Sequence, residues 1–128
     1  MIRASFDHIH LRSLDPDEAA RFYVERLGAT LADRIETPES LRVIVAFPGL
    51  RIFIERVPEG TAAGATAPHR GLEHFGLQVP DIEAAAAELM AAGVEFTMPV
   101  TARGPNLRIA FLRGPDGVSI ELLERKAG

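Results

Sequence analysis

Hydrophobic and polar positions at the start of the chain change from a strand pattern to a helix pattern. Residues 6–12 alternate with a period of two, which predicts a strand carrying His8 and His10 on one face. Asp15 precedes apolar residues at helical spacing and Gly28 follows them, so a helix is predicted between this cap and this stop. Three apolar runs of strand length come next, at residues 29–35, 41–47 and 50–57. The predicted order is therefore strand, helix and three strands.

The second half of the chain is a weak repeat of the first. Residues 72–79 predict a strand that contains His74, and Asp81 follows this histidine by the same spacing that separates Asp15 from His8. An alanine-rich helix is predicted after Asp81. Three further strands are predicted at residues 94–100, 107–113 and 118–123. The pattern predicts an α+β fold of two tandem βαβββ modules.

A stretch of small residues separates the two repeats. Residues 58–69 are punctuated by Gly and Pro and have no periodicity, which is typical of a linker. It divides module one, residues 1–57, from module two, residues 70–128. We expect both modules to form a single domain, 1–128, because a chain of 128 residues has the size of one domain.

Composition and charge narrow the classes of partner and cofactor. Eighteen acidic and 14 basic residues give a net charge of -4, which disfavours nucleic acid and anionic membrane surfaces as partners. The chain has no cysteine, so any metal must bind through nitrogen and oxygen atoms. No leader-like segment and no run near the roughly 20 apolar residues of a membrane span are present, so we expect a cytoplasmic protein.

Two histidines and one glutamate are candidate metal ligands. His8 and His74 occupy equivalent places in the two repeats, each predicted inside a strand, and pseudo-symmetry would bring them together. Glu121 lies in an apolar final strand, where an unpaired carboxylate is costly. Such a set suits divalent Zn, Ni, Mn, Co or Fe(II). Alternatively, the histidines are ordinary hydrogen-bonded strand residues and Glu121 faces solvent.

Three segments resemble the vicinal oxygen chelate superfamily, which includes glyoxalase I, extradiol dioxygenases and bleomycin resistance proteins. Residues 7–11 (DHIHL) and 73–77 (EHFGL) resemble its two histidine strands, and residues 114–122 (GPDGVSIEL) resemble its turn and carboxylate strand. The resemblance implies a glyoxalase-like fold, a curved mixed sheet around a metal-centred cavity. It also implies that the metal ligands are His8, His74 and Glu121.

The same resemblance suggests the chemistry. A metal that chelates neighbouring substrate oxygens stabilises an enolate or another developing oxyanion. We therefore expect a glyoxalase-like lyase or isomerase acting on a small 2-oxo, α-hydroxycarbonyl or acyl thioester substrate. The alternatives are a methylmalonyl-CoA-type epimerase, a small dioxygenase, a thiol transferase, and a non-catalytic antibiotic-binding protein of the bleomycin-resistance kind. Short members of the superfamily also lead us to expect a homodimer.

The first repeat departs from the family where glyoxalase I supplies a fourth ligand that also acts as a base. Counting from the preceding turn places Phe53 opposite Glu121 in the repeat alignment, whereas the spacing of the histidines places Glu55 there. Phe53 and Glu55 share a face. Glu55 is therefore a candidate base, unless it pairs with Arg56 or water. His10 is a candidate for proton transfer, for supporting a ligand, or for lining the cavity.

Three arginines are candidates for binding a substrate carboxylate or phosphate. A planar guanidinium suits such groups because it binds them with two parallel hydrogen bonds. The candidates lie on or near strand ends and loops, at Arg12, Arg103 and Arg108. For each of them an ordinary solvated position is the alternative.

Overall fold

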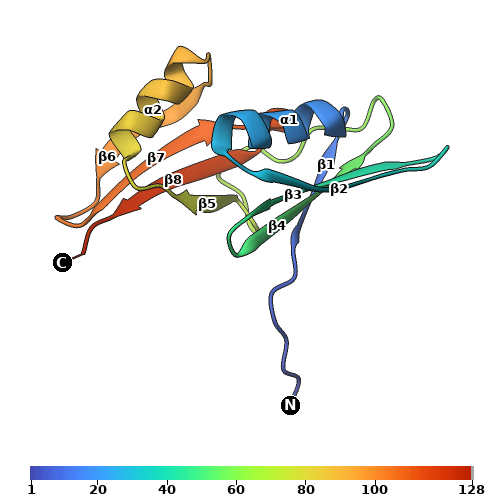
Figure 1. Ribbon diagram of the computed structural model, residues 1–128, viewed down its shortest axis with the longest axis horizontal. Coiled ribbons are helices and arrows are strands. Elements are labelled where there is room, and N and C mark those ends of the chain that lie inside the picture. Colours follow the sequence, from blue (N-terminus) through green and yellow to red (C-terminus); the bar gives the residue numbers. More distant parts are fainter. Residues whose placement is uncertain (128) are drawn as a thin grey trace. The chain divides into compact units, whose positions relative to one another are not determined.

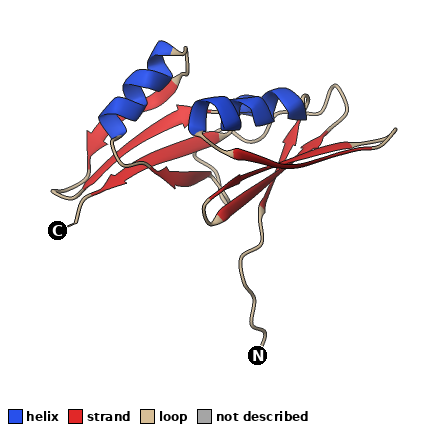
Figure 2. Ribbon diagram, in the orientation of Figure 1, coloured by secondary structure: helices blue, strands red, loops and turns tan. Residues whose placement is uncertain are grey.

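A computed structural model describes residues 1–127. The chain divides into two compact units, the first from Met1 to Ala62 and the second beginning at Ala63. Each unit has a four-stranded mixed sheet with one helix against it (Figure 1, Figure 2). The order strand, helix and three strands occurs twice, which confirms the predicted fold class of two βαβββ modules.

The first unit builds its sheet in the order β1-β4-β3-β2. Its elements are β1 (Ile9–Ser13), α1 (Pro16–Leu27), β2 (Thr30–Glu36), β3 (Leu41–Phe47) and β4 (Leu50–Arg56). β1 runs parallel to β4, and the other neighbours are antiparallel. The helix packs against one sheet face, and the core contains fully buried Tyr23, Val45, Ile52 and Ile54.

The second unit repeats this arrangement in the order β5-β8-β7-β6. Its elements are β5 (His74–Gln78), α2 (Ile82–Ala91), β6 (Phe96–Ala102), β7 (Leu107–Arg113), a single 3-10 turn η1 (Pro115–Gly117) and β8 (Ser119–Arg125). β5 is parallel to β8, as β1 is to β4. Ile82, Leu112, Ile120 and Leu122 form its buried core. Within residues 1–127, neither helix has the length and apolar character needed to cross a membrane.

Both helices begin at the aspartates that the sequence pattern indicates. The Asp15 carboxylate accepts the Glu18 backbone N–H at 3.1 Å, and the Asp81 carboxylate accepts the Ala84 N–H at 3.1 Å. α1 ends at Leu27 and is followed by its C-cap residue, Gly28. The φ angle of Gly28 is 80°, in the left-handed region, which glycine adopts without strain because it has no side chain. The repeated spacing from histidine to aspartate is therefore a repeated path from strand to helix cap.

Several strand bounds differ from the predicted ones. β1 begins at Ile9, so His8 lies just before the strand and not inside it, and β5 begins at His74. The alternation of polar and apolar residues indicates which face of a strand a side chain lies on. The strand itself begins only where its backbone starts to hydrogen-bond with a neighbouring strand. β6 also starts later than predicted, because the Val94 N–H bonds back to the Leu89 carbonyl at 3.0 Å and belongs to the end of the helix.

Candidate functional site

In the first unit, the polar candidates lie on the sheet face that α1 leaves uncovered. The register pairs His10 with Phe53 across β1 and β4, and it pairs both Arg12 and Arg42 with Glu55. These positions alternate with the core residues of the same strands, which face the helix. We call this surface the first open face and define it by six side chains: His8, His10, Arg12, Arg42, Phe53 and Glu55.

The second unit has an equivalent surface on the side of its sheet away from α2. Gly76 of β5 and Phe111 of β7 lie on either side of Glu121 of β8. The neighbours of Glu121 along its strand, Ile120 and Leu122, are buried in the core. We call this surface the second open face and define it by His74, Gly76, Phe111 and Glu121.

Two of the predicted ligands meet on the second open face. His74 Nε2 lies 3.3 Å from Glu121 Oε1, and 30% of the histidine side chain and 16% of the glutamate side chain are exposed. Gly76 leaves room for this pair, because a Cβ there would lie 3.4 Å from Glu121 Oε1 and 2.8 Å from Leu123 Cδ1. The Phe111 ring meets the imidazole edge-on, with 4.8 Å between ring centroids. The pair is thus preformed and accessible from solvent.

His8 is held differently on the first open face. Its ring stacks on Phe53 with 3.8 Å between centroids and only 8° between planes. Its Nδ1 lies 2.6 Å from Asp7 Oδ2. His74 has a similar neighbour at its own Nδ1, where Glu73 Oε2 lies 3.6 Å away. A carboxylate at Nδ1 favours the tautomer that leaves Nε2 of His8 for a metal. His74 has a carboxylate beside each ring nitrogen, and its Nε2 is the candidate ligand atom because it faces Glu121.

The strand register decides which residue of the first unit corresponds to Glu121. Gly76, two residues after His74, pairs with Glu121, and His10, two residues after His8, pairs with Phe53. Phe53 is therefore the structural equivalent of Glu121. Glu55 corresponds to Leu123, one pleat further along the strand.

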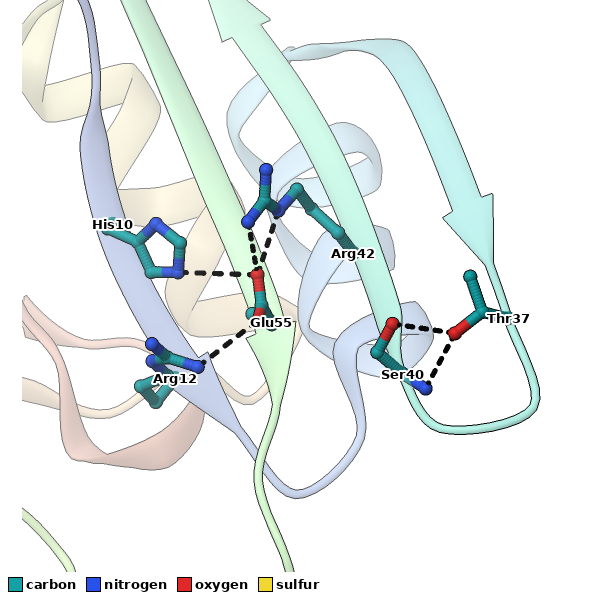
Figure 3. Close-up of polar contacts among 6 residues, drawn as sticks. All are labelled: His10, Arg12, Thr37, Ser40, Arg42 and Glu55. Atoms are coloured by element: carbon teal, nitrogen blue, oxygen red, sulfur yellow. Dashed lines mark hydrogen bonds and ion pairs between the residues drawn. The ribbon is translucent and has the colours of Figure 1, made fainter.

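Glu55 lies at the centre of a charged cluster (Figure 3). Its Oε1 accepts from Arg42 Nε at 2.8 Å and lies 2.7 Å from Arg42 Nη2, while its Oε2 accepts from Arg12 Nη1 at 3.3 Å. His10 Nε2 is 3.6 Å from Oε1. The hydrogen bond from Arg42 holds the pKa of Glu55 below its usual value. The carboxylate is therefore ionised at neutral pH and is already bound by two guanidinium groups.

His10 is the other candidate for proton transfer. Burial of the ring lowers the pKa of His10, and the positive charge of Arg12 acts in the same direction, while Glu55 opposes both. The imidazole is therefore neutral at neutral pH and can accept a proton. Figure 3 shows it beside the Glu55 carboxylate, which would stabilise the charged form once a proton arrives.

The three predicted arginines occupy three different settings. Arg12 belongs to the Glu55 cluster. Arg103 is exposed in the loop between β6 and β7, where its backbone N–H bonds to the Leu107 carbonyl at 2.8 Å. Arg108 pairs with Glu124 in the β-ladder and forms an ion pair with Glu83 of α2. Glu124 faces α2, so Arg108 lies on the opposite side of the sheet from Glu121 and does not join it.

One residue of the charged cluster, Arg42, was not among the candidates predicted from the sequence. Arg42 is the closest cation to Glu55, and its Cζ lies 5.4 Å from the centre of the Phe53 ring. The signal was present, since Arg42 is the one charged residue in an otherwise apolar strand, LRVIVAF. A charge at such a position needs a partner on its own face of the sheet, and Glu55 supplies it.

Across residues 1–127, the structure groups no three His, Asp or Glu side chains closely enough to hold a metal ion. The donors themselves fit a divalent metal. The imidazole nitrogens and the Glu121 carboxylate are of the borderline-hard type, and two of these groups, on His74 and Glu121, lie within 3.3 Å of each other.

Comparison with known proteins places the chain in a family. Residues 5–122 match the sequence profile of the Glyoxalase/Bleomycin resistance protein/Dioxygenase superfamily. The chain therefore belongs to this superfamily, which confirms the resemblance drawn from its motifs. A glyoxalase family protein from Bacillus cereus has the same fold, with a TM-score of 0.82 at 20% identity over 99% of this chain and 97% of that one.

Relatives with assigned names point to one activity within the superfamily. A probable lactoylglutathione lyase from Vibrio cholerae is 32% identical over 93% of this chain and 89% of its own length. A probable chloroplastic lactoylglutathione lyase from Arabidopsis thaliana is 30% identical over 92% of this chain, which spans only 35% of that relative. The chain thus matches nearly all of the bacterial protein and about a third of the plant protein.

Proposed function

We propose that this protein is a divalent-metal-dependent lyase or isomerase of the glyoxalase type. Its substrate is a small molecule with two neighbouring oxygens, of the 2-oxo, α-hydroxycarbonyl or acyl thioester class. The contact between His74 and Glu121 carries the proposal, because it presents two metal-binding groups on a solvent-facing surface. The names of the relatives support the reaction class.

The proposed ligands are His8, His74 and Glu121, each through the atom that the local contacts leave available. The bound metal supplies a Lewis acid that polarises a substrate oxygen and stabilises the oxyanion that develops there. Zn, Ni, Mn, Co and Fe(II) all suit this set of donors. Because the position equivalent to Glu121 is Phe53 in the first unit, the chain would supply three ligands, and substrate oxygens and water would supply the others.

The proton acceptor belongs to the Glu55 cluster. Glu55 and His10 are both candidates, and the cluster favours His10 because the two guanidinium groups on Glu55 weaken that carboxylate as a base. In this arrangement His10 takes the α-proton and Glu55 stabilises the imidazolium that forms.

Arg12 and Arg42 are proposed to hold an anionic group of the substrate. Their two positive charges exceed the single negative charge of Glu55, so the cluster keeps a net attraction for an anion. Arg103 stays a candidate for the same role because its side chain is exposed in a loop. Arg108 is left out of this proposal because it pairs with Glu83 on the helix side of the sheet.

A homodimer is proposed for the assembly. β2 is an edge strand of the first sheet and is exposed at every position, including the apolar Leu31 and Ile35. Exposed apolar edges are commonly covered by a second chain. Sedimentation analysis at micromolar concentration should give twice the 13.9 kDa chain mass, and a single species at 13.9 kDa would contradict the proposal.

Two measurements on one preparation test the proposed function. Protein purified without chelators should contain close to one transition-metal ion per chain. With a 2-oxoaldehyde and glutathione or another thiol, it should form the 2-hydroxyacyl thioester, and chelation should stop the reaction. A protein that binds no metal but sequesters a planar antibiotic would place it instead with the non-catalytic members of the superfamily.

A further inference from the structure

The two units hold their histidines by different contacts at the same place in the fold. On the second open face, His74 Nε2 contacts the carboxylate of Glu121 at 3.3 Å. On the first open face, the equivalent of Glu121 is Phe53, and His8 lies flat on its ring at 3.8 Å. The carboxylate contact of one unit is therefore replaced by a ring-on-ring contact in the other.

The Phe53 ring is itself fixed in place. Arg42 lies over the ring, with its Cζ 5.4 Å from the centroid. The register pairs Arg42 with Glu55, whereas His8 precedes the pair formed by Ile9 and Ile52, so the two contacts reach Phe53 from opposite directions along β4. Arg42 is in turn bound to Glu55 at 2.7 Å. The charged cluster therefore helps to hold the Phe53 ring, on which His8 stacks, in position.

The stacking defines the plane of the His8 ring, and Asp7 defines its tautomer. Asp7 accepts at Nδ1 at 2.6 Å, but its side chain is 84% exposed, so this contact alone holds the ring weakly. The contact with Asp7 still allows the imidazole to rotate about its Cβ–Cγ bond. The nearly parallel stack on Phe53 restricts this rotation. Together these contacts restrict the orientation of the imidazole, and with it the position of Nε2.

We propose that Phe53 is a positioning residue for His8, whose stacked ring orients the imidazole for metal binding where the second unit uses a carboxylate. This inference rests on the proposed function, because it assigns His8 to the metal. Phe53 donates no atom to the metal and acts through His8 alone. Groups that orient a ligand in this way typically change metal affinity by about 10- to 100-fold.

The test compares Co²⁺ binding, measured by titration, in four proteins: wild type, Phe53→Leu, Phe53→Tyr and Phe22→Leu. Phe53→Leu keeps the apolar bulk and removes the flat ring, so we expect roughly 10-fold weaker Co²⁺ binding. Phe53→Tyr keeps the ring and should bind as the wild type does. Phe22→Leu removes a ring from α1, where it packs edge-on to Tyr23, and should leave Co²⁺ affinity unchanged.

Proton NMR of the metal-free proteins provides a second readout, independent of the metal. The carbon-bound ring protons of His8 should be shifted upfield by the Phe53 ring in the wild type and in Phe53→Tyr, and the shift should vanish in Phe53→Leu. Equal Co²⁺ affinity of wild type and Phe53→Leu would overturn the inference, as would unchanged His8 signals. A wild-type protein that binds no Co²⁺ at all would instead overturn the metal site of the proposed function.

Discussion

The two open faces share a backbone plan but differ in how much charge they carry. The first gathers two arginines and His10 around Glu55, whereas the second presents His74 and Glu121 beside Gly76 and Phe111, with Glu73 at the other ring nitrogen of His74. On the first open face, the Glu55 carboxylate is paired with arginines of its own unit. On the second, the Glu121 carboxylate contacts the imidazole of His74, and we propose that both groups bind the metal.

This difference indicates how two copies of one module can take different roles. In the proposed function, the second unit would provide metal-binding atoms, and the first would provide proton transfer, anion recognition and one further histidine ligand. One part of this difference is a single register position, where Phe53 stands in place of the carboxylate found at Glu121. The predictions below test this division of roles, beginning with the largest expected effect.

Removing His74 should abolish metal binding. His74→Ala takes away one proposed ligand and leaves Glu121 without its neighbour, so we expect Co²⁺ affinity to fall at least 100-fold, measured by titration. The side chain is 30% exposed, so the free energy of unfolding should change by less than about 1 kcal/mol. His69→Ala changes a histidine of the linker and is the matched control. Full metal binding by His74→Ala would show that His74 is not a metal ligand.

Within the Glu55 cluster, the order of two effects identifies the base. His10→Asn should lower turnover by roughly 10²-fold, because it removes the proton acceptor. Glu55→Gln should lower turnover by only about 10-fold, because it removes a supporting charge, and both variants should keep their metal. Glu25→Gln, an exposed change on α1, is the control. The reverse order of the two effects would assign the base to Glu55.

A methyl group at Gly76 should disturb the second open face without unfolding it. The added Cβ would approach Glu121 Oε1 at 3.4 Å and Leu123 Cδ1 at 2.8 Å, and the latter atom is the movable end of a side chain. We expect Gly76→Ala to weaken Co²⁺ binding about threefold to tenfold as Glu121 shifts. Gly64→Ala, where a Cβ meets open space, should have no effect on titration. If Gly76→Ala and the wild type bind Co²⁺ with the same affinity, the space that Gly76 leaves beside Glu121 is not needed for metal binding.

The smallest expected effect concerns stability and its dependence on pH. Asp17 of α1 accepts two hydrogen bonds from Arg34 of β2 at 2.9 Å, and they lower the pKa of Asp17. A lowered pKa in the folded state means that the stabilisation is present above the unfolded pKa and is lost as pH falls through the folded pKa. Because Asp17 is 41% exposed, Asp17→Asn should cost less than about 1 kcal/mol in urea unfolding at pH 7. The cost should disappear in acid, and a cost independent of pH would contradict the assignment.

Much of the fold could be predicted because its signals are local. The interior strands β3 and β7 have the predicted bounds, 41–47 and 107–113, since each is an apolar run closed by turns. The helix caps at Asp15 and Asp81 were likewise predictable from neighbouring residues. The start of β1 was not, because it depends on where a distant strand begins to pair.

The candidate site was harder to predict because it depends on register. Alternation placed His8 and His10 on one face of their strand and Phe53 and Glu55 on one face of theirs, but it does not state which residues of neighbouring strands lie opposite Glu55. The partnership with Arg42, and the stack of His8 on Phe53, follow only once the strands are paired. For the same reason, two alignments of Glu121 with the first repeat stayed open until the register selected Phe53.

The most direct test of the account is the position of the metal itself. A crystal soaked or grown with Co²⁺ should show one anomalous-scattering peak per chain, roughly 2.0–2.3 Å from His8 Nε2, His74 Nε2 and a Glu121 carboxylate oxygen. Glu55 should remain bound to Arg42 and not to the metal. A peak coordinated by Glu55, or one that lacks either histidine, would contradict the division of roles between the two units.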